Sequence, residues 1–401
     1  MAPPFARRGS QDHRIRIETS SQLIIEQTPD PMMNTVTASI DIDALQHNFA
    51  VVRRHAPHSK IIAVLKANAY GHGLLPVAHA LAQADAYAVA RVEEALVLRA
   101  NAITKPILVL GGFFSAEALP LLAKHELQTT LHTWEQLALL EQASLPTPIK
   151  VWLKLDTGMN RLGLRAEELP AFIERLSHCR NVVQPFHLMT HFSQSDEQDT
   201  QATQLQIEEF NRLSAHLPGE RAMANSAGIL AWPASRSDWI RPGLMLYGAS
   251  PFAGQLAADH DLRPVMTLKS QLIATRACAQ GEAVGYGGHW VADRNTTLGV
   301  VAAGYGDGYP RMAPEGTPIL INGRRVPIVG RVSMDMITVD LGPAARDKVG
   351  DEVTLWGEGL PVEQVAEKIG TIPYELLTRL TSRVHLTHCD KRDQMPMLKL
   401  A

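Results

Sequence analysis

The sequence predicts an α/β protein in which a (β/α)8 TIM-like barrel is followed by a mainly β C-terminal domain. Its 401 residues exceed what one ordinary hydrophobic core organises, so two domains are expected. Short apolar runs alternate with helical patterns in the first part, and runs rich in Val, Ile and Thr follow after about Arg263. We therefore expect a disordered or extension tail at 1–35, a barrel at 36–262 and a mainly β domain at 263–401.

Eight apolar runs carry the barrel prediction, since each has a length suited to a buried parallel strand. They lie at 61–65, 86–90, 107–110, 127–131, 149–155, 182–189, 221–224 and 239–246. An amphipathic stretch precedes them and helical patterns separate most of them, at 42–55, 74–84, 92–101, 133–143 and 167–178. Such barrels hold their chemistry at the C-terminal ends of the strands. A doubly wound open sheet is the alternative, but no strand precedes a glycine fingerprint and a helix.

The second domain is predicted by short β-rich runs with Gly and Pro between them. These runs lie at 268–274, 297–302, 318–321, 326–329, 336–341 and 352–355. The apolar periodicity at 362–369 predicts one helix within this domain.

The bulk composition favours a small-molecule partner. With 38 basic and 41 acidic residues, the chain lacks the positive charge that nucleic acid would require. Cys179, Cys278 and Cys389 are odd in number and far apart, which favours a reducing, cytoplasmic location over a disulfide framework. The longest apolar run of the tail, 23–25, is too short for a signal peptide or membrane span. Met32 or Met33 would make an equally sensible start.

The segment IIAVLKANAYGHG at 61–73 predicts a reactive lysine at a strand end. Lys66 follows an apolar strand, and an ammonium partly withdrawn from water has a lowered pKa. A neutral lysine amine can form a Schiff base with an aldehyde, although a lysine that extends to the barrel rim is the plain structural alternative. Tyr70 could serve a phosphate, because Gly71 and Gly73 allow close approach of the backbone to a ligand.

This segment resembles the pyridoxal 5'-phosphate (PLP) attachment site of the alanine racemases. In that family the lysine carries the cofactor and the tyrosine contacts its phosphate. The resemblance spans about residues 35–386, and implies interconversion of L-alanine and D-alanine by two bases, Lys66 and Tyr286 of the partner subunit. The D-alanine would serve as a peptidoglycan precursor or arise in alanine catabolism, and the sequence leaves both roles open.

The motif WLKLDTGMNRLG places three charged side chains after the fifth strand. Lys154 and Asp156 could form a barrel ion pair, with Arg161 exposed. The resemblance instead implies that Arg161 approaches the cofactor's phenolic oxygen and the substrate carboxylate, which suits an arginine fork. In that family the matching lysine is often carbamylated and pairs with this arginine, which makes Lys154 a candidate for carbamylation; the sequence leaves its state open.

Two histidines, His187 and His191, belong to the predicted sixth strand and the residues that follow it. Their spacing would chelate a metal on a helix, but the strand-like context lacks that geometry, so we expect no metal site. The resemblance places His191 in a hydrogen-bond network beside the cofactor ring. We expect His187 to be a core or barrel residue.

The seventh and eighth strands deliver residues suited to phosphate binding, which barrel enzymes commonly place after these strands. The candidates there are Asn225, Ser226, Arg241, Gly243 and Leu244. The resemblance implies that phosphate is held by Ser226, Gly243, Leu244, Tyr70 and Tyr374. It also implies that Arg241 donates to the pyridine nitrogen, which an arginine cannot protonate. The ring would then be a weaker electron sink, and transamination would be restrained.

Three segments of the second domain complete the resemblance. VGYGGHW supplies Tyr286, VAAGYGDGYPR supplies Tyr305, and RVSMDMITVD supplies Met334 and Asp335. A lone tyrosine is usually a core or interface residue, so the catalytic role of Tyr286 follows from the resemblance alone. The resemblance implies that Tyr286 enters the site from the partner subunit of a homodimer, and that Tyr305, Met334 and Asp335 shape the substrate pocket.

Other PLP proteins offer alternative functions. A non-catalytic PLP-binding homeostasis protein has a similar barrel but lacks the second domain that carries Tyr286 and Met334. A PLP decarboxylase generally uses a catalytic cysteine, and no cysteine of this chain lies in a comparable segment. A broader-specificity amino-acid racemase is closest in chemistry, but such enzymes are commonly exported and bear disulfides.

Overall fold

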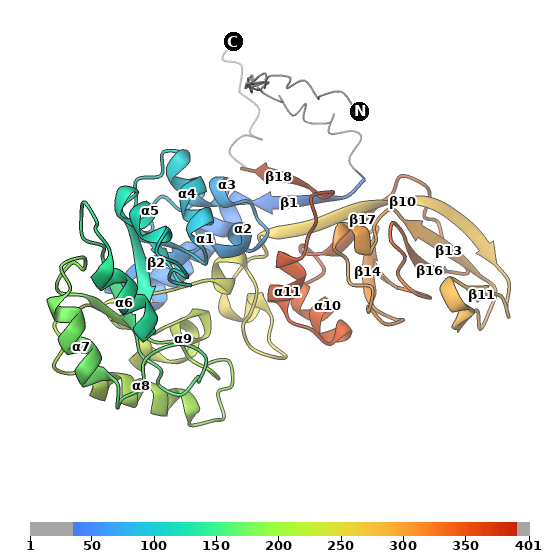
Figure 1. Ribbon diagram of the computed structural model, residues 1–401. Helices are drawn as coiled ribbons and strands as arrows, with labels where there is room; N and C mark the ends of the chain where they lie inside the picture. The colour runs from blue at the N-terminus through green and yellow to red at the C-terminus, as the bar shows by residue number, and fades with distance from the viewer. Residues whose placement is uncertain (1–34, 391–401) are drawn as a thin grey trace, which may run out of the picture. The chain divides into compact units, whose positions relative to one another are not determined.

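The computed structural model describes residues 35–390, and Figure 1 shows the arrangement of their helices and strands. The tail expected at 1–35 lies outside the described residues except for Thr35. Within the described range no helix is both long enough and apolar enough to cross a membrane.

The first domain is a closed barrel of eight strands, which confirms the predicted fold. All neighbouring strands pair in parallel, and β9 closes on β2. The strands are β2 (Lys60–Val64), β3 (Ala86–Val89), β4 (Ile107–Val109), β5 (Leu127–Leu131), β6 (Val151–Lys154), β7 (His187–Met189), β8 (Arg221–Ala222) and β9 (Trp239–Ile240). The runs predicted at 182–189 and 239–246 give shorter strands, because Pro185 and Pro242 lack the N–H that a sheet ladder needs.

Helices alternate with these strands, as expected for a (β/α)8 barrel. The helices are α1 (Ile42–His55), α3 (Leu74–Ala80), α4 (Val92–Ala100), α5 (Ala118–Lys124), α6 (Trp134–Gln142), α7 (Leu169–His178), α8 (Ala202–Ser214) and α9 (Ser226–Ala231). Three of them, α5, which contains Pro120, and α8 and α9, lie outside the helical ranges read from the sequence.

The second domain is built on an eight-stranded sheet in which β10 (Met266–Cys278) is the central member. Register shifts near Leu268 and Leu272 allow this long strand to pair with β1, β13 and β17 along its length. The other strands are β13 (Thr296–Val301), β14 (Pro318–Ile321), β15 (Arg324–Pro327), β16 (Ile337–Gly342) and β17 (Glu352–Trp356), and β11 (Ala283–Val284) with β12 (Trp290–Val291) forms a separate hairpin. This sheet confirms the mainly β character of the domain.

The strand β1 (Thr37–Asp41) belongs to this second sheet, although it precedes the barrel in the sequence. It pairs antiparallel with β10 and parallel with β18 (His385–Cys389). The helix α1 follows immediately, with the Asp41 carboxylate accepting the Ala44 N–H at 2.9 Å as its N-cap. The two ends of the described chain therefore meet in one sheet.

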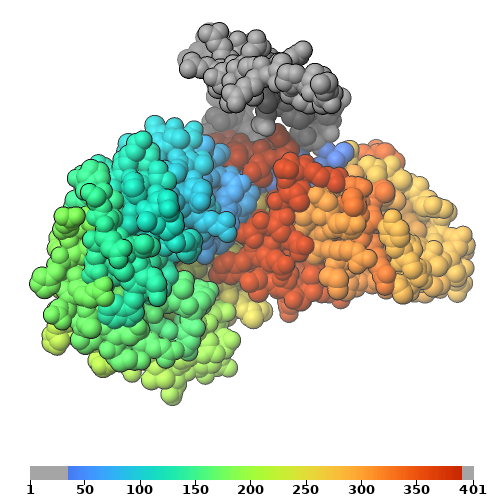
Figure 2. All heavy atoms as spheres, in the orientation of Figure 1, coloured from blue at the N-terminus to red at the C-terminus, as the bar shows by residue number. Residues whose placement is uncertain are grey.

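The helices α10 (Val362–Ile369) and α11 (Pro373–Thr378) lie between β17 and β18 in the chain and contact the barrel domain. The helix α11 contacts the turn that follows β2, and Figure 2 shows the red surface of this C-terminal segment adjoining the blue surface of the early barrel elements. The close contact between this turn and α11 requires glycine at position 71, because a Cβ there would lie 2.1 Å from the Leu377 carbonyl oxygen. Gly71 also has φ +83°, which favours glycine.

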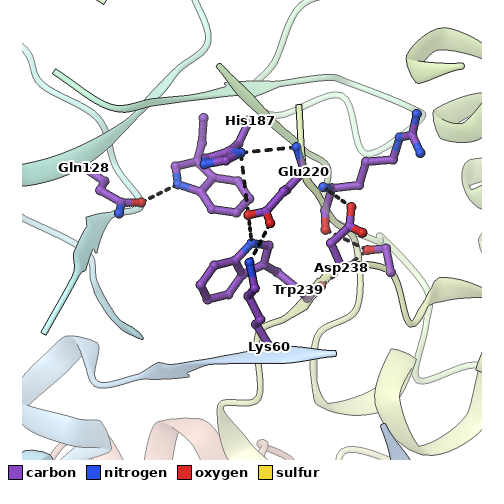
Figure 3. A network of polar contacts seen from close by, with 9 residues as sticks. Lys60, Gln128, His187, Glu220, Asp238 and Trp239 are labelled. Atoms are coloured by element: carbon purple, nitrogen blue, oxygen red, sulfur yellow. Dashed lines mark hydrogen bonds and ion pairs between the residues drawn. The ribbon is translucent and has the colours of Figure 1, made fainter. Parts of the chain in front are cut away.

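A polar network closes the N-terminal end of the barrel (Figure 3). The Glu220 carboxylate accepts from Lys60 Nζ and from Trp239 Nε1, each at 2.6 Å. His187 accepts the Glu220 N–H at 3.2 Å and lies 4.7 Å from the Trp152 ring. His187 is therefore a barrel residue, as expected. It begins β7, whereas His191 follows the C-terminal end of that strand.

Candidate active site

A cavity of about 360 Å³ lies at the C-terminal mouth of the barrel, within the size range of small-molecule sites. It gathers expected residues from the ends of five strands and from α11: Lys66, Tyr70, Lys154, Arg161, His191, Asn225, Ser226, Arg241, Gly243, Leu244 and Tyr374. Its wall also includes residues that sequence analysis did not name, among them Ala90, Gly111 and Met189.

The segment after Lys66 is a single left-handed turn. Ala67, Asn68, Ala69 and Tyr70 have φ between +52° and +55°, a conformation that costs an L-residue about 1–2 kcal/mol. The Glu94 carboxylate accepts the N–H of Ala67 at 2.6 Å, and the Asn68 side chain accepts the N–H of Leu74 at 2.8 Å. The turn allows Lys66 and Tyr70 both to line the cavity.

His72 supports the same turn from within the protein. Its Nδ1 lies 3.0 Å and 2.9 Å from the carbonyl oxygens of Ala69 and Tyr70, so Nδ1 must carry the proton and donate. The ring is fully buried, and desolvation lowers the pKa of His72 to about 4. A neutral imidazole with this tautomer therefore fixes two carbonyls of the turn.

Four cations converge on the cavity. Desolvation lowers the pKa of Lys66, and the charge of Arg161 lowers it further, while the Glu94 carboxylate opposes them. Desolvation, followed by the charges of Arg241 and Arg161, lowers the pKa of Lys154 to about 8. Each amine is thus closer to its neutral form than an exposed lysine, and the cavity as a whole favours an anion.

The charge of Asp156 raises the pKa of Lys154, against the larger effects of desolvation and the two arginines, but no ion pair within 4 Å joins them among residues 35–390. The Asp156 carboxylate instead accepts the N–H groups of Gly158 and Asn160, at 3.1 Å and 3.0 Å. Asp156 therefore shapes the loop that carries Arg161.

Arg241 is buried and held by backbone carbonyls. Its terminal nitrogens donate to Ala222 and Thr190 at 2.7 Å and to Met223 at 3.2 Å. Desolvation lowers the pKa of Arg241 to about 10, which leaves it charged at neutral pH. Its Nη2 also lies 3.5 Å from Nδ1 of His191, whose pKa is held well below its usual value by desolvation and by the charge of Arg241.

The opposite wall has the features of a phosphate cradle. Ser226 begins the short helix α9, and its hydroxyl accepts the N–H groups of Gly243 and Met245, at 3.0 Å and 3.2 Å. A Cβ on Gly243 would lie 2.5 Å from the Tyr70 hydroxyl, so glycine is required for this approach. Asn225 caps α9 through its side chain, which accepts the Gly228 N–H at 2.9 Å.

Two tyrosines, Tyr70 and Tyr374, line this cradle, and the buried Tyr247 packs against Tyr70. The Tyr70 ring stacks on Tyr247 at 4.7 Å between centroids and lies 6.0 Å from the Tyr374 ring. Burial raises the pKa of Tyr70, and it raises the pKa of Tyr374 to about 12, so both hydroxyls stay protonated and can donate to an anion. Sequence analysis missed Tyr247, because an aromatic residue in an apolar run carries no signal beyond core packing.

Four expected residues of the second domain, unlike Tyr374, do not line this cavity. Tyr286, Tyr305 and Met334 are exposed, with Tyr286 at 69% of its full accessibility, and Asp335 is also exposed. The loops of Tyr305 and Met334 are joined through hydrogen bonds, and Arg383 bonds the Asp335 carboxylate at 2.8 Å. All four residues are therefore exposed and do not belong to the cavity wall.

Comparison with known proteins agrees with this architecture. The model for the alanine racemase N-terminal domain matches residues 40–251, and that for the C-terminal domain matches residues 265–388. An alanine racemase of Aeromonas hydrophila subsp. hydrophila is 68% identical over 356 residues, which cover 89% of this chain and 100% of the relative. An alanine racemase of Yersinia pestis bv. Antiqua is 57% identical over 89% of this chain and 99% of the relative.

Among solved structures, the biosynthetic alanine racemase from Pseudomonas aeruginosa superimposes with a TM-score of 0.86 at 44% identity, over 89% of this chain and 100% of that chain. The barrel and the lysine-bearing cavity at its C-terminal mouth define a barrel enzyme of the isomerase class. The chain belongs to the alanine racemase family.

Proposed function

We propose that this enzyme interconverts L-alanine and D-alanine with PLP as its cofactor. The observation that carries the proposal is the convergence of a lysine of lowered pKa, two arginines and a phosphate cradle on one cavity. The activity named for relatives that are up to 68% identical supports the same substrate. The three free cysteines support a cytoplasmic location.

The residues of the cavity fit PLP. Lys66 would hold the cofactor covalently, Arg241 would face the ring nitrogen, and Asn225 would border the ring. The phosphate would lie among Ser226, Gly243, Leu244, Tyr70 and Tyr374, where Ser226 fixes the N–H groups of Gly243 and Met245 and the tyrosine hydroxyls can donate. When bound, PLP supplies an electron sink that acidifies the α-carbon of the amino acid.

The protein supplies the two bases. Lys66 would take or give a proton on one face of the α-carbon, and its lowered pKa favours the neutral amine needed for this. Tyr286 of the partner subunit would act on the other face, with His191 and Arg241 stabilising the phenolate charge. Arg161 would bind the substrate carboxylate, since it lines the cavity and its fork suits bidentate recognition.

A second subunit is proposed because Tyr286 is exposed and does not line the cavity of its own chain. One chain contributes Lys66 to the cavity but leaves Tyr286, Tyr305, Met334 and Asp335 away from it. A homodimer in which each chain presents these residues to the cavity of its neighbour would complete two equivalent sites.

The function is tested by incubating the purified protein with each L-amino acid and measuring the D-isomer formed. Conversion of alanine well above that of every other amino acid supports the proposal. Comparable conversion of several amino acids would instead establish a broader-specificity racemase, and PLP binding without conversion would establish a non-catalytic homeostasis protein.

Lys154 is expected to be carbamylated. Its pKa of about 8 leaves roughly a tenth of the amine neutral at pH 7, and only the neutral amine adds to CO2, releasing one proton. The resulting anion would lie among Arg161, Arg241 and Lys66, which offsets their mutual repulsion. With 13C-labelled bicarbonate, a carbamate signal should appear, grow as the pH is raised, and vanish in Lys154→Gln. The exposed Lys150→Gln is the control, and a signal that survives Lys154→Gln would contradict the assignment.

Arg241 is expected to protect the reaction specificity. The Arg241→Glu enzyme should racemise alanine more slowly, by on the order of a hundredfold, and should convert more cofactor to its aminated form. Arg241→Gln loses the same bonds to the carbonyls of Ala222 and Thr190 but cannot protonate the ring, so it is the matched control. The aminated cofactor is measured by absorbance, and a parallel loss of both reactions in the two variants would make Arg241 a structural residue.

A further inference from the structure

Glu94 lies between the two loops that follow β2 and β3. Its Oε1 accepts the N–H of Ala67 at 2.6 Å, and its Oε2 accepts the N–H groups of Ala90 and Arg91, at 2.8 Å and 3.1 Å. The contacts to Ala90 and Arg91 belong to the start of α4, where an acidic residue commonly satisfies unpaired N–H groups. The contact to Ala67 does not, because it joins residues 27 positions apart.

The contact to Ala67 acts on a strained segment. Ala67 is the first residue of the left-handed turn and directly follows Lys66. Left-handed L-residues persist only where the surroundings fix them firmly. A charged acceptor bonded to the first N–H of the turn is such a constraint, and it is stronger than a neutral acceptor.

The position of Glu94 also matters for the charge of the site. Lys66 lies among Arg161 and Arg241, whose charges disfavour a second cation. The Glu94 carboxylate acts in the opposite direction on the lysine amine. Its partner loop is part of the cavity as well, since Ala90 lines the wall.

We infer that Glu94 is a positioning residue that clamps the left-handed turn after Lys66 to the loop after β3, and thereby fixes the lysine amine within the cavity. The inference rests on the proposed role of Lys66 as the residue that carries PLP. Glu94 touches neither cofactor nor substrate, and it acts through the backbone of Ala67.

The test compares Glu94→Gln with Glu93→Gln in the full-length enzyme. Glutamine keeps the shape of Glu94 but offers one acceptor oxygen in place of two, whereas Glu93 is an exposed neighbour on the same helix. Hydrogen exchange measured by mass spectrometry should become faster in the peptide covering 66–73 for Glu94→Gln alone. The dissociation constant for PLP should rise about tenfold, as expected for loss of a hydrogen bond to a charged group.

A helix cap alone would give a different result. In that case exchange would accelerate only within Val92–Ala100, PLP affinity would stay at the wild-type value, and the inference would be overturned. If Glu94→Gln does not fold, Glu94→Asp takes its place, because aspartate keeps the charge but has a shorter side chain. Faster exchange at 66–73 in this variant supports the clamp, and unchanged exchange there refutes it. If the wild-type protein does not bind PLP, the proposed function is wrong. The hydrogen-exchange measurement at 66–73 would still test the clamp.

Discussion

Replacement of Lys66 by alanine is expected to abolish racemisation, with a loss of at least about 10³-fold, because one side chain would anchor the cofactor and serve as a base. Borohydride reduction of the wild-type enzyme followed by peptide mapping should place the cofactor on Lys66. Burial and Arg161 lower the pKa of this amine, and its place on the turn that carries Tyr70 distinguishes it from Lys154, whose pKa is also lowered.

Lys124→Ala provides the control for this prediction. Lys124 lies exposed on α5, away from the cavity, and its replacement should leave both the adduct and the activity unchanged. A reduced adduct on any lysine other than Lys66 would refute the assignment of the attachment site.

Mixing a Lys66→Ala chain with a Tyr286→Phe chain is expected to restore activity that neither homodimer has. In the mixed dimer, one site would carry both defects and the other would combine an intact Lys66 with an intact Tyr286 of its neighbour. With random exchange, half of the dimers are mixed and each has one active site of two, so about a quarter of the wild-type rate should return. The rate is measured after subunit exchange has been verified.

A doubly substituted chain provides the reciprocal control. Mixed with wild type, it should form dimers in which neither site is complete, because each site would hold one defect. If Lys66 and Tyr286 instead act within one chain, these mixed dimers would keep one active site, and the two single variants would remain inactive together. The two mixtures thus give opposite results under the two arrangements.

The barrel could be predicted from the sequence because its strands are continuous apolar runs, as at 61–65 and 127–131. The strands β1 and β18 could not, because their burial depends on partners at the far end of the chain. The left-handed turn was also missed, because Asn68 is the only one of its four residues whose type favours a positive φ, and Ala67, Ala69 and Tyr70 do not. Glu94 could have been noticed as an acidic residue in the first turn of a helix, but its contact with Ala67 is a tertiary one.

Within the second domain, the pairing of β1 with β18 constrains the order in which the chain folds. Residues 37–41 cannot pair with residues 385–389 until the latter, which are synthesised last among the described elements, have been made. All strands of the barrel lie between Lys60 and Ile240, so the barrel can close while the rest of the chain is still being made. The second sheet has a much higher contact order, because its inner strand pairs with the end of the chain. During synthesis, one edge of β1 therefore stays open to other chains until translation is nearly finished.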